Sequence, residues 1–137
     1  MKKFLIVILT IISINVSAQN DNLPFKELGA YSEEFSSNNI VARMIEGLGY
    51  RFYWATESLT DKDLKYKPSE DSRSSLQTLE HIYGLSVFIL YTFEGKEYDF
   101  SQDEMTFTEL RNGTLKNLKI VYDCLLYTSD AADDLIG

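Results

Sequence analysis

The sequence predicts an all-α fold, an up-down helix bundle, from two observations. Three stretches, residues 40–59, 75–93 and 107–123, repeat apolar residues at spacings of three and four, which places those residues along one side of a helix. No stretch alternates apolar and polar residues for long, as a half-buried strand would. We therefore expect one small helical domain of about 105 residues, residues 19–123, without an internal repeat.

The N-terminal residues have the three parts of a secretory signal peptide. Lys2 and Lys3 precede an apolar run, residues 4–14, and Val16 to Ala18 provide small residues at its exit. The run is too short to cross a membrane as a helix, which needs about 20 apolar residues. We expect cleavage near Ala18, a periplasmic or extracellular location, and no stable membrane anchor.

Residues 124–133 resemble the translation of a transposon-end sequencing adapter in one reading frame. We therefore expect residues 124–137 to be a non-native tail on a truncated gene fragment. The alternative is a natural acidic tail that ends a helix. On the first interpretation Cys124, the one cysteine of the chain, says nothing about the natural protein, and the domain has to be stabilised by packed apolar faces or a bound metal instead of disulfides.

The first expected helix, residues 40–59, follows a polar lead-in, residues 19–38, with Asn38 or Asn39 as its N-cap. Gly47, Arg51 and Trp54 lie on the flank of its apolar stripe. They are either part of a ligand cleft, in which Arg51 pairs with an anion and Trp54 forms a wall, or an aromatic edge over the core with an arginine that reaches water. The apolar stripe consists of Ile40, Val41, Met44, Ile45, Leu48, Phe52, Ala55 and Leu59.

The second expected helix begins near Ser75, where Ser at the N-cap and Gln77 at the third helical position fit a capping box. Apolar residues surround most of this helix, so we expect it to be the most buried element and to end near Gly95. The third begins near Phe107 after a second capping-box pattern, Thr106 to Glu109. Its stripe consists of Phe107, Leu110, Thr114, Leu118, Val121 and Tyr122.

His81, the one histidine, lies in the second helix on the same side as Gln77, Thr78, Leu85 and Phe88, and we expect it to face inward. A neutral imidazole among apolar groups is a suitable ligand for a divalent metal. One histidine cannot make a catalytic metal site, which uses three protein ligands and an open position. The residues alone also allow a second interpretation, in which His81 is a core histidine that forms a hydrogen bond to a neighbouring helix.

The order of these features over residues 40–123 resembles the DinB-like superfamily. The features are a helix, a turn that contains Lys67 and Pro68, and a capped apolar helix with His81 about two turns in. The resemblance implies a four-helix bundle whose helix four is missing from this fragment. It also implies a divalent metal, with zinc or nickel expected first, which His81 binds together with two histidines beyond the truncation.

Two functions follow as expectations. The resemblance implies a metal-dependent transferase or hydrolase that acts on a small-molecule or thiol substrate, and the signal peptide implies that it is exported. Arg51, Trp54, Gln77 and Thr78 are the residues that could form its cleft. The alternative is a non-catalytic helical binding or structural module without metal, in which Gly47, Arg51 and Trp54 form the contact surface. A homodimer fits either function. Nucleic acid is not an expected partner, because the net charge of -8 offers little attraction to phosphate.

Overall fold

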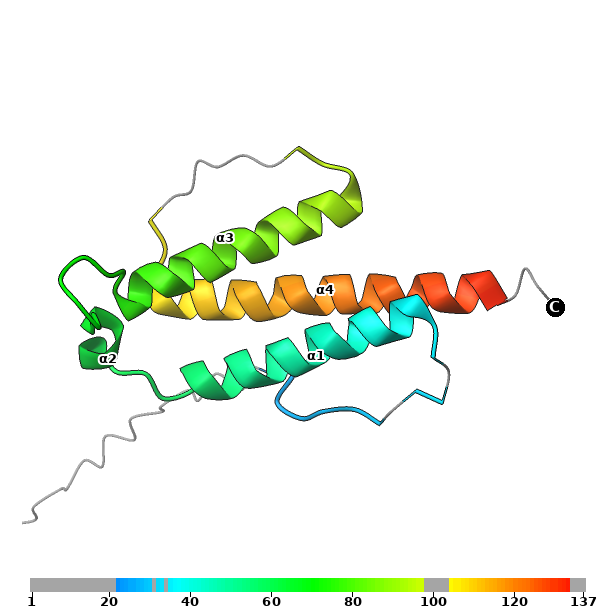
Figure 1. Cartoon of the computed structure of the whole chain (residues 1–137), viewed down its shortest axis with the longest axis horizontal. Coiled ribbons are helices and arrows are strands. Elements are labelled where there is room, and N and C mark those ends of the chain that lie inside the picture. Colours follow the sequence, from blue (N-terminus) through cyan, green and yellow to red (C-terminus); the bar gives the residue numbers. More distant parts are fainter. Residues whose placement is uncertain (1–21, 31, 34, 98–103, 134–137) are drawn as a thin grey trace, which may run out of the picture.

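The structure, a computed structural model, describes residues 22–30, 32–33, 35–97 and 104–133, and of residues 129–133 only the backbone. Its helices are α1 (Ser37–Thr56), α2 (Asp61–Lys65), α3 (Ser75–Glu94) and α4 (Phe107–Asp133) (Figure 1). The described residues contain no strand, so the all-α prediction is confirmed. The expected signal peptide, residues 1–18, lies outside the described residues.

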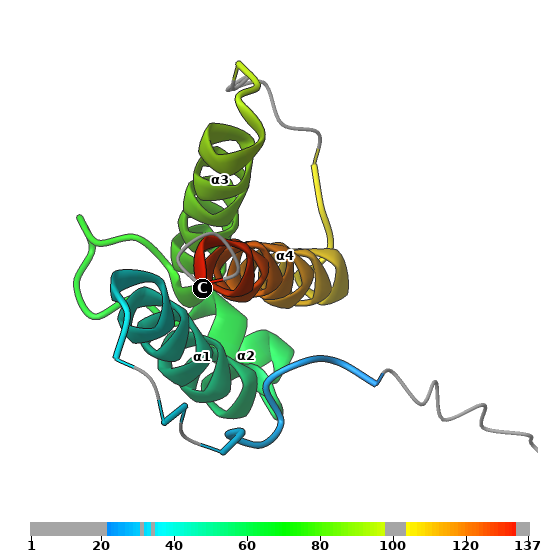
Figure 2. The same cartoon turned by 90° about the vertical axis from the view of Figure 1, so that its right-hand side faces the viewer.

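Helix α4 lies between α1 and α3 and contacts both of them along its length (Figure 1). The view turned by 90° shows α1 and α3 on different sides of α4 (Figure 2). Over the described part of the chain, no Cα atom of α1 lies within 8 Å of a Cα atom of α3, and α2 packs against the start of α3. The bundle is thus organised around α4.

The core follows the inner sides of α4. The largest fully buried side chains, Leu110, Thr114, Leu115 and Val121, all belong to this helix. The prediction that the second helix would be the most buried is wrong, since Leu85, Phe88 and Ile89 of α3 are exposed. Apolar residues do surround α3, but within the described chain α4 and α2 are the helices closest to it, and much of its apolar surface stays exposed.

Local side-chain chemistry sets the helix ends. The Ser74 hydroxyl accepts the Gln77 N–H at 3.1 Å and the Gln77 side chain accepts the Ser74 N–H at 2.8 Å, which confirms the capping box of α3. Gly95 ends α3 in the left-handed region with φ 65°, a conformation that glycine adopts without a steric penalty. The prediction for α1 is wrong by one turn at its start: Ser36 is the N-cap, and it accepts the N–H of Asn39, which lies inside the helix.

Residues 22–30, which we call the N-terminal strap, run along α1 and α4. The sequence predicts a polar lead-in here, yet Leu23 and Phe25 are buried in the main core beside Phe52, Tyr53 and Leu115. Phe25 has a left-handed φ of 68°. Its ring occupies the space above Gly49, where a Cβ atom would lie only 2.4 Å from Cδ2 of the ring. The glycine therefore makes room for the strap.

The segment that resembles an adapter continues α4 to Asp133. Leu125 is buried in a second cluster together with Ala42, Leu90 and Val121. Its origin stays a prediction. Among the described residues, we find no helix with the length and apolar character required to traverse a lipid bilayer.

Candidate functional site

His81 is exposed on α3. The prediction that its ring faces inward is therefore wrong for the core that the described residues form. Its neighbours on that side, Leu85 and Phe88, are also about half exposed. Within the described ranges, no three His, Cys, Asp or Glu side chains are grouped so that they could hold a metal ion. His81 as a ligand stays a prediction that needs residues outside the described part.

The four residues expected to form a cleft lie on two different helices. Arg51 is exposed and donates to the Gly47 carbonyl of its own helix at 3.3 Å. This exposure fits the alternative interpretation, in which the arginine reaches water. Gln77 and Thr78 lie in the first turn of α3, where Gln77 caps the helix and the Thr78 hydroxyl donates to the Ser74 carbonyl at 3.0 Å. The pair on α1 and the pair on α3 therefore have separate hydrogen-bond partners, and their cleft stays a prediction.

Trp54 belongs to the attachment of the strap. Its indole N–H donates to the Lys26 carbonyl at 3.1 Å, and its ring packs edge-on against Tyr50 and Tyr53. About half of the side chain remains exposed. Trp54 therefore holds the strap, a segment of the same chain. The sequence suggests a different role for it, as the wall of a ligand cleft.

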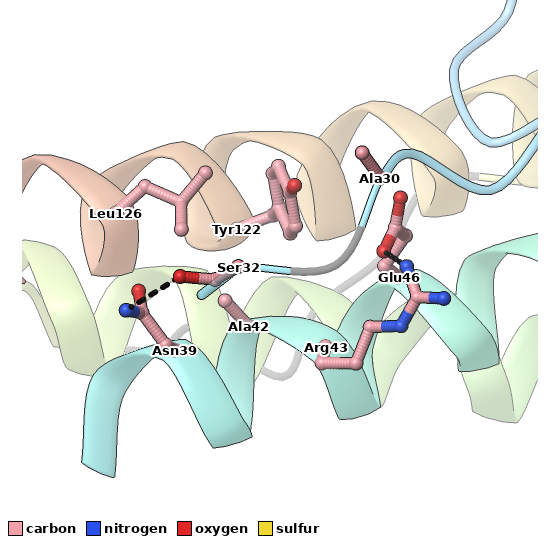
Figure 3. Close-up of a pocket in the computed structure, with 8 residues that line it drawn as sticks. All are labelled: Ala30, Ser32, Asn39, Ala42, Arg43, Glu46, Tyr122 and Leu126. Carbon is pink, nitrogen blue, oxygen red and sulfur yellow. Dashed lines mark hydrogen bonds and ion pairs between the residues drawn. The ribbon is translucent and has the colours of Figure 1, made fainter. Parts of the chain in front are cut away.

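The structure contains a pocket that the sequence does not predict. It has a volume of about 190 Å³ and lies between α1 and α4, beside Ala30 and Ser32 (Figure 3). Helix α1 forms its floor, α4 forms the opposite wall, and Ala30 and Ser32 close one side. The lining residues are Ala30, Ser32, Asn39, Ala42, Arg43, Glu46, Tyr122 and Leu126.

Glu46 is the most unusual residue of this pocket, because it is an acid that is only 6% exposed. One carboxylate oxygen accepts the N–H of Gly29 at 2.6 Å, and the other accepts Nη1 of Arg43 at 2.5 Å. The same Arg43 nitrogen donates to the Gly29 carbonyl at 3.1 Å. A buried carboxylate is tolerated when it is paired and hydrogen-bonded in this way.

Tyr122 forms the wall opposite Glu46 (Figure 3). Burial raises the pKa of its phenol, and the negative charge of Glu46 raises this pKa further, while the positive charge of Lys119 opposes the effect. The phenol is therefore neutral at physiological pH. At the other end of the pocket, the Asn39 amide donates to the Ser32 hydroxyl at 3.2 Å. Hydrogen-bonding groups on apolar walls suit the binding of a small polar molecule.

Sequence reasoning missed Glu46, Arg43 and Tyr122 as a group. One signal was present: Glu46 lies four residues after Ala42 and three before Gly49, so an acid sits between two small residues. Small residues on one helix face allow another segment to approach closely. The approaching segment, the strap, carries no helical periodicity, so its position cannot be read from the sequence.

A second polar group joins α4 to the C-terminal end of α1. The Arg111 guanidinium donates to the Thr56 hydroxyl at 3.0 Å and to the Tyr53 carbonyl at 3.3 Å, and it forms an ion pair with Glu57. It also lies 4.7 Å from the centre of the Tyr53 ring, a cation–π distance. These contacts fix how α1 and α4 pack.

Comparison of the chain with models of protein families, with characterised proteins and with solved structures gives no match. The fold and the function therefore have to be argued from the residues and the geometry described above.

Proposed function

We propose that α1, α3 and α4 are three helices of a four-helix bundle of the DinB-like type, and that a further helix covers the sides of α1 and α3 that α4 leaves free. The exposed apolar residues of these two helices support the proposal, and they comprise Val41, Met44 and Leu48 on α1 and Leu85, Phe88 and Ile89 on α3. Burial of a large apolar side chain contributes about 1.5 to 3 kcal/mol. Covering these six would contribute an amount comparable to the stability of a whole domain, about 5 to 15 kcal/mol.

Replacement of Leu85 with alanine tests this proposal when it is measured in two chains. In the 137-residue chain, where Leu85 is half exposed, we expect a loss below about 1 kcal/mol in the free energy of unfolding. In the protein encoded by the complete reading frame, we expect a loss of about 2 to 5 kcal/mol, because the side chain becomes part of a core. Urea denaturation measures both values.

The buried Leu79 provides the matched control, because it belongs to the same helix and already packs in the main core. Leu79→Ala should be costly in both chains. A small loss for Leu85→Ala in the complete protein would show that no helix covers this side of α3.

For the function we propose a divalent-metal-dependent transferase or hydrolase, in which His81 is one ligand. The supporting observation is that His81 shares a side of α3 with Leu85 and Phe88, two apolar residues that are each about half exposed. A helix that covers this side would also enclose the imidazole. The metal would polarise a bound water or thiol and lower its pKa. Zinc and nickel are the first candidates, since both bind imidazole well.

The metal content of the purified complete protein tests this function. We expect about one equivalent of zinc or nickel by elemental analysis, and its loss in the His81→Ala variant. Glu80→Gln is the control, because Glu80 is exposed and points about 100° away from His81 around the helix. Metal that stays bound in His81→Ala would exclude His81 as a required ligand.

A non-catalytic binding module is the second candidate, and the pocket around Glu46 is the observation that favours it. Four of its polar side chains, Ser32, Asn39, Arg43 and Glu46, are held by hydrogen bonds before any ligand arrives. Such preorganisation lowers the cost of binding a small polar molecule. A complete protein that folds and carries no metal would favour this module over the enzyme.

A further inference from the structure

We propose that the N-terminal strap is a detachable wall of the Glu46 pocket, latched by Glu46, and that it opens while the helices stay folded. The strap and the pocket lie on the α1–α4 side of the molecule, and His81 lies on α3. The proposal therefore does not depend on a metal site or on a fourth helix.

The strap is attached to the helices at three points. At its start, Leu23 and Phe25 enter the main core. In its middle, the Lys26 carbonyl accepts the indole N–H of Trp54. At its end, Gly29 is held through both of its backbone polar groups by Glu46 and Arg43.

Glu46 is the latch because the whole third attachment depends on its carboxylate. It accepts the Gly29 N–H directly, and it positions the Arg43 guanidinium that holds the Gly29 carbonyl. Hydrogen bonds that involve ionised groups are about twice as strong as those between neutral groups. Loss of the negative charge would therefore weaken three linked contacts at once.

The strap can also leave without breaking the backbone hydrogen bonds of a helix. Across the described residues, no backbone-to-backbone hydrogen bond joins it to a helix, so side chains provide its polar attachments. The helices keep their own backbone ladders without it. In addition, Phe25 has a left-handed backbone conformation, φ 68°, which is unfavourable for an aromatic residue and is relieved on release. Segments with few backbone attachments open locally before the global structure does.

Opening of the strap would change the pocket directly. Ala30 and Ser32, which follow Gly29, form the side of the pocket that closes over α1 (Figure 3). When Gly29 leaves Glu46, this wall moves away and the carboxylate becomes accessible. A small molecule that contacts both the wall and α1 would in turn hold the strap closed, because it binds only the closed state.

Hydrogen exchange of the 137-residue chain, measured by NMR, tests the latch through the Glu46→Gln variant. We expect the Gly29 amide and the Trp54 indole N–H to exchange at least tenfold faster, while the Leu115 amide in the centre of α4 keeps its rate. Trp54 is the one tryptophan of the sequence, so its indole signal and its fluorescence report the strap without ambiguity. We also expect its emission to shift to longer wavelength.

Glu57→Gln is the matched control, since Glu57 is also an acid paired with an arginine, but it lies just after the C-terminal end of α1, about three turns from Glu46. It should leave the Gly29 and Trp54 rates unchanged. If Glu46→Gln does not fold, Arg43→Gln removes one side of the same latch and should show the same selective change with a smaller amplitude. Unchanged Gly29 exchange in these variants would overturn the proposal, because contacts other than Glu46 would then hold the strap. Equal acceleration of Gly29 and Leu115 would also overturn it, because the strap would then open only when the whole domain unfolds.

Discussion

Replacement of Leu115 with alanine should lower the free energy of unfolding by about 2 to 5 kcal/mol. Leu115 has no exposed surface and lies in the main core, between residues of the strap, α1 and α3. Removing three of its carbons leaves a cavity that neighbours from several elements cannot all fill. Since a small domain is stable by about 5 to 15 kcal/mol, this one change removes a large share of the total.

Urea denaturation followed by circular dichroism at 222 nm measures this loss. Ile120→Ala is the control in the same helix, because Ile120 is 43% exposed and should cost less than about 1 kcal/mol. Equal losses for the two variants would contradict the placement of α4 at the centre of the bundle.

Replacement of Gly49 with alanine should lower the free energy of unfolding by about 1 to 3 kcal/mol, although alanine favours helices more than glycine does. A Cβ atom at this position would lie 2.4 to 2.9 Å from three atoms of the Phe25 ring. The ring has to leave its place, and the strap has to move with it. We therefore also expect the Trp54 fluorescence to shift to longer wavelength.

Gly47 offers a matched control two residues earlier in the same helix. A Cβ atom there would lie 3.5 Å from Nη1 of the Arg51 side chain, which is an ordinary contact with the end of a flexible group. Gly47→Ala should therefore be neutral or stabilise the protein by up to about 1 kcal/mol. If Gly49→Ala behaved in the same way, Phe25 would not be packed against α1.

The three long helices could be predicted from the sequence because their signals are local. Capping boxes at Ser74 and Thr106 act through side chains within one turn of the helix start, and Gly95 ends α3 through its own left-handed backbone, so these signals are visible in the sequence itself. The start of α1 was predicted about one turn too late, because Asn38 and Asn39 are N-cap residues as favourable as Ser36. The structure selects Ser36.

Burial was harder to predict, because it depends on which partners a helix meets. The apolar residues around α3 indicate a buried helix, and the amphipathic pattern of α4 indicates a surface helix. The structure reverses this order, because α4 lies between two helices, while α4 and α2 are the helices closest to α3 within the described chain. Periodicity gives the side of a helix that is buried, and it does not give the number of its neighbours.

The pocket could not be predicted for a related reason. Its acid, Glu46, is held by Gly29, which is 17 residues earlier in the sequence, and its wall residue Tyr122 comes from the other end of the chain. No local pattern links these three. His81 stands at the opposite extreme, because its chemistry is evident from the sequence alone. The proposed role of His81 as a metal ligand needs further ligands, and the described residues do not supply them.

The position of α4 also has a consequence for synthesis. The contact of α1 with α4 and the contact of α3 with α4 both depend on this helix. The chain up to residue 106 therefore contains the apolar sides of α1 and α3 before α4 can cover them. Ribosomes add about 5 to 20 residues per second. The apolar sides of α1 and α3 stay uncovered until α4 has been synthesised and has left the ribosome. A translational pause before residue 107 should prolong the interval in which chaperones, or other nascent copies, can capture these surfaces.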